Sequence, residues 1–205
     1  MKIIVFGATG GVGQSLVKQA LAKGLEVTAF VRTPSKLDTQ HANLTVVQGD
    51  ALNQAEVSAA IAGHDAVVSC LGSSKGMKQS TDLREMTKHI VKGMQEQGVE
   101  RIVYTASAGV HKELTGVMGQ LLMLLLKNPL IDHRAAVEAI FKANLNYTIA
   151  RPMGLTDKEF TGIYRESTTT TPSKSSTIPR ADVAHFILKA LGDSSYERTS
   201  IGLAT

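Results

Sequence analysis

Cysteine and tryptophan are nearly absent from this sequence, which has one cysteine, Cys70, and no tryptophan. A single thiol cannot form an internal disulfide or a metal site built from several cysteines of the chain. Cys70 lies in the apolar run 66–71, which indicates a buried strand residue and not a nucleophile. The 6 histidines show no spacing typical of metal ligands, so we expect no bound metal.

Neither sign of charge dominates the chain. Its 22 lysines and arginines exceed its 18 acidic residues by a net charge of +4, and they are scattered instead of forming a stripe with interleaved aromatic residues. This pattern argues against a nucleic-acid partner. A mildly basic protein suits anionic small molecules such as a phosphorylated cofactor.

Long hydrophobic runs are also missing. The most apolar segment, "GQLLMLLLKNPL" at 119–130, is shorter than the roughly 20 residues that cross a bilayer, so we expect no membrane partner. Helical apolar runs are usually buried, which favours a core helix or a pocket wall over a subunit interface and leaves both monomer and homodimer open. No secretory signal precedes the first predicted strand, which begins at Lys2, so a cytoplasmic location is expected.

Strand-like and helical segments alternate along the chain. Strands are predicted at 2–6, 26–31, 44–48, 65–70, 99–105 and 145–150. Helices are predicted at 11–23, 53–61, 80–97, 132–143 and 180–191. This order predicts an α/β fold with a doubly wound parallel sheet of the Rossmann type, as a single NAD(P)-binding domain over 1–205. Residues 152–179, rich in serine and threonine, are expected to form an irregular excursion on the substrate side that carries a small hairpin.

The segment "FGATGGVGQ", residues 6–14, joins the first predicted strand to the first helix. Gly7 can make the tight turn, Gly10 lets a pyrophosphate approach the backbone, and Gly13 allows the helix to pack close to its strand. Free N–H groups at the positive end of the helix would face the phosphates. The sequence therefore predicts a dinucleotide-binding turn, with a plain tight turn as the alternative.

Two residues at the ends of the next strands bear on the choice of cofactor. Arg32 follows the second strand, where NAD-selective proteins usually carry an acidic residue for the ribose 2′-OH. A guanidinium suits a 2′-phosphate, which favours NADP(H), although Arg32 can also be a solvated loop cation. Asp50 in "QGDAL" can accept a hydrogen bond from the adenine amino group or serve as a helix cap or turn residue. Both interpretations of Asp50 stay open.

The acid–base pair of alcohol-oxidising short-chain dehydrogenases, a tyrosine with a lysine four residues later, does not occur. The residues four positions after the tyrosines are Ala108, Arg151, Thr168 and Ser200. Alcohol or ketone chemistry therefore loses support. A flavin, a quinone or a linear tetrapyrrole can take a hydride into a delocalised system and obtain its proton from solvent, so it needs positioning more than a strong protein acid.

The chain resembles a known family over most of its length. The segments "VFGATGGVGQ", "FVRTPSKL", "QGD", "VYTASAG", "IDHRAAVEAI", "ARPMGLTD" and "TIPRADVAHFILKAL" occur in the order and approximate spacing of the atypical short-chain dehydrogenase family. Within that family, the chain is most similar to the branch of biliverdin-IXβ reductases and NADPH-dependent flavin reductases. Many enzymes share the glycine motif, but its combination with Ser107, His133 and the late "ADVAHF" segment is more specific.

The resemblance implies a role for each matching position. Ser107 and His133 would lie near the nicotinamide and the substrate as the candidate catalytic residues, and Pro152 would line the wall beside the nicotinamide. The cofactor would be held by Gly7, Thr9, Gly10, Gly13, Arg32 and Asp50. The alternatives are that Ser107 satisfies a backbone group or caps a turn, and that His133 caps a helix.

The predicted function is an NADPH-dependent reductase that passes hydride to free flavin, or to a quinone or bilin, with the flavin as a substrate and not a tightly bound group. The alternative is a non-catalytic protein that senses NAD(P) and binds a protein partner. Absence of the tyrosine–lysine pair is compatible with both. An epimerase or dehydratase of nucleotide sugars is weakened by the same absence.

Overall fold

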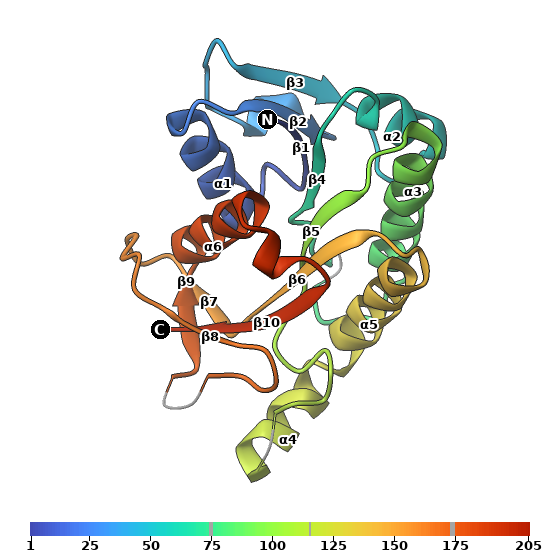
Figure 1. The fold of residues 1–205 in the computed structure, drawn as a ribbon. Helices are drawn as coiled ribbons and strands as arrows, with labels where there is room; N and C mark the ends of the chain where they lie inside the picture. The colour runs from blue at the N-terminus through green and yellow to red at the C-terminus, as the bar shows by residue number, and fades with distance from the viewer. Residues whose placement is uncertain (74–75, 115, 173–174) are drawn as a thin grey trace.

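A parallel β-sheet forms the centre of the protein in the computed structural model, which describes residues 1–73, 76–114, 116–172 and 175–205 (Figure 1). Within these residues the sheet has 8 strands in the order β3-β2-β1-β4-β5-β6-β10-β8, and all neighbours run parallel except β8, which is antiparallel to β10. The strands are β1 (Lys2–Phe6), β2 (Glu26–Val31), β3 (Leu44–Gln48), β4 (Ala66–Ser69), β5 (Arg101–Thr105), β6 (Asn146–Pro152), β8 (Arg165–Ser167) and β10 (Thr199–Ala204). The predicted doubly wound parallel sheet is confirmed.

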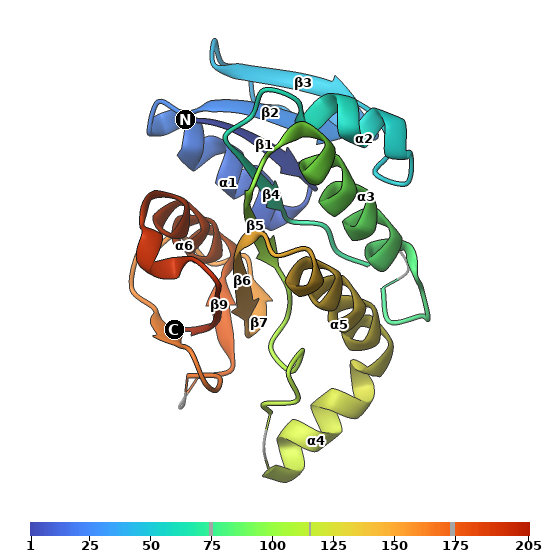
Figure 2. The ribbon, with the colours of Figure 1, turned by 45° about the vertical axis from the view of Figure 1, so that its right-hand side comes forward.

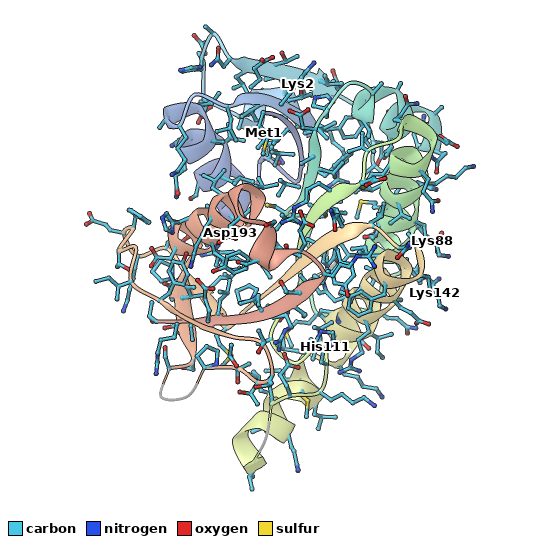
Figure 3. The ribbon with its side chains drawn as sticks, in the orientation of Figure 1. Met1, Lys2, Lys88, His111, Lys142 and Asp193 are labelled. Atoms are coloured by element: carbon cyan, nitrogen blue, oxygen red, sulfur yellow. The ribbon has the colours of Figure 1, made fainter. Side chains whose placement is uncertain are left out.

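Helices cover both faces of this sheet (Figures 1 and 2). One face carries α1 (Gly11–Ala22) and α6 (Arg180–Gly192). The other carries α2 (Gln54–Ile61), α3 (Asp82–Gln97) and α5 (Lys127–Lys142). Lys88 on α3 and Lys142 on α5 point outward from this second layer (Figure 3).

The alternation of side chains along β1 divides the interior into two cores. Ile3 and Val5 pack toward α1 and α6, whereas Ile4 and Phe6 pack toward α2 and α3. All four side chains are fully buried, because successive residues of a strand point to opposite faces and both faces of a parallel sheet are covered. The strand is therefore apolar from Ile3 to Phe6.

The excursion between β6 and α6 differs from its prediction. Its strands β7 (Gly154–Thr156) and β9 (Thr177–Pro179) pair in parallel, so the predicted small hairpin is wrong. A hairpin joins antiparallel strands, whereas here the chain runs from β7 through the edge strand β8 before it returns to β9. The buried carboxylate of Asp182 on α6 holds this segment by accepting hydrogen bonds from the backbone N–H groups of Thr161 (3.0 Å) and Gly162 (2.8 Å).

The apolar segment 119–130 was predicted to be a core helix or a pocket wall. It is only partly buried, so a core position for the whole segment is wrong, whereas Leu122 and Leu126 line a cavity, as residues of a pocket wall would. It spans the end of α4 (Gly116–Leu125) and the start of α5, and α4 projects beyond the body of the molecule (Figure 2). Leu121, Leu124 and Leu125 are 59%, 68% and 60% exposed. Apolar residues occur around the helix, so periodicity alone did not tell a buried helix from a projecting one. None of the helices among the described residues is long and apolar enough to span a bilayer.

Candidate active site

Two cavities adjoin at the carboxyl ends of the parallel strands, on either side of β1 and β4. The strand order reverses between these two strands, which is where open α/β sheets bind ligands. The first cavity has a volume of about 180 Å³ and the second about 740 Å³. Both are lined by Gly10, Cys70, Leu71 and Gly72. Together they form an elongated site across the glycine turn.

The glycine turn has little room for side chains. Gly7 has a φ of +79°, and a Cβ there would lie 2.6 Å from the carbonyl oxygen of Cys70. A Cβ on Gly13 would collide with the carbonyl oxygen of Gly7, because α1 packs directly against the turn. Gly10 donates its backbone N–H to Gly7 O at 3.0 Å, and only that oxygen lies near its own Cβ position. The space above Gly10, at the start of α1, is therefore open, and it is where a dinucleotide pyrophosphate is predicted to bind.

The first cavity contains the two residues predicted to contact the adenosine half of the cofactor. Arg32 directly follows β2, is exposed and lines the cavity. Asp50 also lines it, and its Oδ1 accepts a hydrogen bond from Leu52 N at 3.0 Å, so Asp50 is a turn residue. The cap of α2 is Asn53, whose side chain accepts from Ala55 N and Glu56 N. The second carboxylate oxygen of Asp50 can still accept from a ligand.

The second cavity brings together residues that are distant in sequence. Ser107 follows β5, His133 lies on α5 and Pro152 ends β6, and all three line the cavity. The Ser107 hydroxyl donates to Ala108 O at 3.1 Å, as expected for a residue that satisfies a backbone group. It also remains part of the cavity wall, so the two interpretations of Ser107 are compatible.

His133 does not cap a helix, because α5 begins at Lys127. The residue is 8% exposed, and its Nδ1 lies 3.0 Å from the buried hydroxyl of Tyr104 on β5. Burial lowers the pKa of His133 to about 4, and burial likewise raises the pKa of Tyr104. His133 is therefore a neutral hydrogen-bonding group at neutral pH.

The neighbouring Asp132 performs the capping instead, although it caps a different helix. Its carboxylate is buried and accepts hydrogen bonds from Leu83 N at 3.2 Å and Arg84 N at 3.0 Å, in the first turn of α3. These contacts fix α5 against α3 and so fix the position of the His133 ring at the cavity wall. Two adjacent residues in the segment "IDHR" thus have different roles: Asp132 is structural, and His133 lines the cavity.

Cys70 lies between the two cavities, immediately after β4. Its Sγ lies 3.9 Å from the hydroxyl of Thr105. Burial raises the pKa of the thiol to about 12, so the thiolate needed for nucleophilic attack does not form near neutral pH. This agrees with the prediction that Cys70 is not a nucleophile.

A match to a known family decides the class of protein. The model of the NAD(P)H-binding family matches residues 7–194, from the glycine turn to the end of α6. The chain belongs to this family. It therefore has an NAD(P)H-binding fold of the oxidoreductase type, which confirms the NAD(P)-binding part of the predicted resemblance.

Two curated relatives show how far the similarity in sequence extends. A 3-beta-hydroxysteroid dehydrogenase of Mycolicibacterium neoaurum is 37% identical over 120 residues, which cover 53% of this chain and 32% of that protein. An uncharacterized chloroplastic protein of Arabidopsis thaliana is 32% identical over 175 residues, which cover 78% of this chain and 61% of that protein. The chain thus spans less than two thirds of the length of either relative.

Solved structures share the fold over the entire chain. A Rossmann-fold NAD(P)-binding protein from Shigella flexneri has a TM-score of 0.81 and 25% identity, with 100% of this chain and 93% of that chain covered. ChuY, an anaerobilin reductase from Escherichia coli O157:H7, has a TM-score of 0.84 and 21% identity, with 100% and 97% covered. A short-chain dehydrogenase/reductase from Veillonella parvula in complex with NADP has a TM-score of 0.82 and 22% identity, with 100% and 94% covered. The latter two show likeness of fold alone.

Most of the predicted site residues line the two cavities. The first is lined by Gly7, Thr9, Gly10, Arg32 and Asp50, and the second by Gly10, Ser107, His133 and Pro152. Gly13 lies behind the turn and serves the packing of α1. The roles of these residues toward a cofactor or substrate remain predictions.

Arg180 is a cavity residue that the sequence analysis missed. It begins α6, and its side chain lies across Gly11, where an added Cβ would come within 2.5 Å of Arg180 Cδ and 2.9 Å of its Nε. Its Nη1 donates to the exposed carboxylate of Asp157 at 2.6 Å. The guanidinium of Arg180 therefore lies beside the positive N-terminal end of α1. A cation next to a helix N-terminus favours an anion between them.

Proposed function

We propose that this protein is an NADPH-dependent reductase that transfers a hydride to a small conjugated acceptor, a free flavin, a quinone or a bilin. The observation that carries the proposal is the pair of adjoining cavities at the strand switch point, with the glycine turn between them. One cavity suits the adenosine half of the cofactor. The second leaves space for the nicotinamide and an acceptor beside Ser107 and His133.

The chain's own groups suit positioning more than acid catalysis. When bound, NADPH supplies the hydride from its nicotinamide ring. His133 is neutral, and the thiol of Cys70 is protonated, so the proposal assigns Ser107 and His133 to hydrogen bonding with the nicotinamide or the acceptor. The proton required to complete reduction comes from solvent through the second cavity. Such an arrangement lowers the barrier by orientation.

The first experiment follows the loss of NADPH absorbance while FMN, riboflavin, a soluble quinone and a bilin are added in turn to the purified protein. Acceptor-dependent oxidation above the protein-free rate is the expected result. If NADPH binds tightly and none of the four acceptors is reduced, the reductase proposal fails. The function as an NAD(P) sensor with a protein partner then becomes the better explanation.

Arg32→Ala is expected to weaken NADPH binding by about 1–3 kcal/mol and to leave NADH binding nearly unchanged. The reason is that only NADPH carries the 2′-phosphate that the guanidinium would contact. Calorimetric titration of both cofactors measures the two affinities. Lys36→Ala is the matched control, since Lys36 is a nearby exposed cation that does not line the cavity. Equal losses of NADPH and NADH affinity for Arg32→Ala would contradict phosphate selection.

Arg180→Ala is expected to weaken NADPH and NADH binding equally, by about 1.5–3 kcal/mol, because both cofactors have the pyrophosphate. Gly11→Ala is a second test, since its Cβ would displace the Arg180 side chain without removing its charge. The same titrations distinguish this pattern from the NADPH-selective loss of Arg32→Ala. Arg165→Ala, an exposed arginine in β8, is the control. Unchanged affinities in both Arg180→Ala and Gly11→Ala would remove Arg180 from the cofactor site.

The pH dependence of reduction tests the state of His133. Because burial lowers its pKa to about 4, we expect kcat/KM to show no His133 titration at the ordinary histidine value of 6.5. His133→Asn keeps a neutral hydrogen-bonding side chain and should give a pH profile of the same shape. A step near 6.5 that disappears in His133→Asn would mean that the imidazolium takes part in the reaction.

A further inference from the structure

The second cavity is lined by many apolar side chains and few charged ones. Its lining includes Leu114, Leu122 and Leu126, here called the leucine wall, and also the apolar side chains of Met153 and Leu155. Among the described lining residues, Arg180 is the one cationic side chain, and it lies at the glycine turn in an ion pair with Asp157. A phosphate or propionate group placed against the leucine wall would lose water without gaining a cationic partner. Such desolvation disfavours charged acceptors at this end of the cavity.

The leucine wall continues onto the surface of α4. Leu122 and Leu126 are spaced by one helical turn and line the cavity. Leu121 and Leu125, each one residue earlier, form the adjacent stripe and are 59% and 60% exposed. A ligand in the cavity can therefore extend along α4 and remain in contact with apolar side chains. The helix rises about 6 Å between Leu121 and Leu125, so this stripe can contact part of an extended alkyl chain.

The packing of α4 keeps this stripe next to the cavity mouth. A Cβ on Gly119 would lie 2.8 Å from the backbone carbon of Leu114, so the helix approaches the loop after β5 closely. That loop is held in turn by the buried ion pair of Glu113 with Arg151, at 2.5 Å. His111, labelled in Figure 3, adds a contact between its Nε2 and the hydroxyl of Ser200 at 2.9 Å. The loop thus provides a fixed base for the start of α4.

We infer that the acceptor is a neutral quinone with a long apolar side chain, whose ring occupies the second cavity and whose chain lies along Leu121 and Leu125. This inference rests on the proposed reductase function and selects one of its acceptor classes. In the reaction the quinone gains one hydride from NADPH and one proton from solvent, so it leaves as the hydroquinone and NADP⁺ remains. FMN and bilins carry the charged groups that the leucine wall does not accommodate.

The test compares two benzoquinones with the same ring, one with a methyl and one with a decyl substituent, below the concentration at which micelles form. The decyl compound is expected to have a kcat/KM at least about tenfold higher, since each buried methylene favours binding. Calorimetric titration of the NADP⁺-loaded protein with the oxidised quinones gives a readout independent of turnover. The affinity for the decyl compound should be higher by a similar factor.

A double variant, Leu121→Gln with Leu125→Gln, is expected to reduce the decyl-to-methyl ratio toward one in both measurements. Its matched control is Phe160→Gln with Ile163→Gln, which alters two exposed apolar residues, 53% and 79% exposed, outside the cavity lining. The control should keep the wild-type ratio. An equal fall in the control would show that the chain effect does not arise at α4, and would overturn the inference.

Three further outcomes separate this inference from the proposed function. Reduction of the methyl quinone or FMN without any chain dependence would overturn the inference and leave the reductase function intact. Absence of reduction with every acceptor would overturn both. Sedimentation velocity tests whether a second copy covers α4: a dimer that the α4 variant converts to monomer would assign these leucines to a subunit contact and overturn the inference.

Discussion

Arg151→Met is expected to lower the free energy of unfolding by about 3–5 kcal/mol, because it leaves the buried carboxylate of Glu113 without its partner. The side chains of Arg151 and Glu113 are 1% and 5% exposed, and Nη1 lies 2.5 Å from Oε1. Nη2 of Arg151 also donates to Ser200 O at 3.1 Å and to Ser167 O at 3.4 Å. One guanidinium therefore joins β6, β8, β10 and the loop that precedes α4. Denaturant unfolding measures the loss.

Lys142→Met is the matched control for this variant. Lys142 pairs with Glu138 at 2.7 Å, but these side chains are 76% and 64% exposed (Figure 3). Solvent weakens such a pair, so the expected change is within about 0.5 kcal/mol. Replacing both Arg151 and Glu113 by methionine and leucine should restore much of the stability, since no buried charge is then left unpaired. A loss for Arg151→Met no larger than for Lys142→Met would contradict the argument.

The ion pair of Arg151 with Glu113 is expected to make the folded protein less stable in acid. Burial by itself raises the pKa of Glu113, but backbone hydrogen bonds and Arg151 lower it on balance below the ordinary value of 4.5. A carboxyl whose pKa is lowered by folding stabilises the folded state above its unfolded pKa. That contribution is lost as the pH falls from about 4.5 through the lower pKa of the folded state.

The central sheet could be predicted from sequence because its strands are covered on both faces. β1 therefore contains a continuous apolar run from Ile3 to Phe6, and β2 is apolar except for Glu26 and Thr28; the observed bounds of both strands equal the predicted ones. β10 was missed because its sequence, "TSIGLA", is short and contains polar residues and a glycine. It is specified by its parallel pairing with β6, a contact between distant segments that local periodicity does not report.

The glycine turn of the candidate site could be predicted from sequence, whereas Arg180 could not. Gly7 and Gly13 have local signatures, since their spacing and the adjoining strand and helix specify the turn. Arg180 has no such signature, because a cation in the first turn of a helix usually faces solvent. Arg180 reaches the cofactor side only because α6 packs beside α1 in the fold, which places the arginine over Gly11. The one local sign of this contact in the sequence was Gly11 itself, because the dinucleotide-binding motif does not require glycine at that position.

Gly10→Ala is expected to weaken NADPH binding about 100-fold or more while the protein stays as stable as the wild type. Gly10 has φ −77° and ψ 161°, a conformation open to any residue, and its added Cβ would come no nearer than 3.4 Å to Gly7 O. Reduced freedom of the unfolded chain should stabilise the variant by up to about 1 kcal/mol, which offsets the less favourable alanine at the N-cap position of α1. The new methyl group would instead occupy the space for the pyrophosphate. A pyrophosphate displaced in this way would lose about two charge-assisted hydrogen bonds from backbone N–H groups at the start of α1. At ~1.5 kcal/mol each, their loss accounts for the expected 100-fold fall in affinity.

Gly13→Ala is the comparison that separates packing from binding at the same turn. Its Cβ would collide with Gly7 O and lie 2.8 Å from Ala8 Cα, so backbone must move and α1 must shift away from β1. We expect this variant to lose cofactor affinity as well as about 1–3 kcal/mol of stability or more. Calorimetric titration with NADPH and denaturant unfolding measure the two quantities for each variant. If Gly10→Ala binds NADPH as the wild type does, the pyrophosphate does not lie above this turn, whatever the stability of Gly13→Ala.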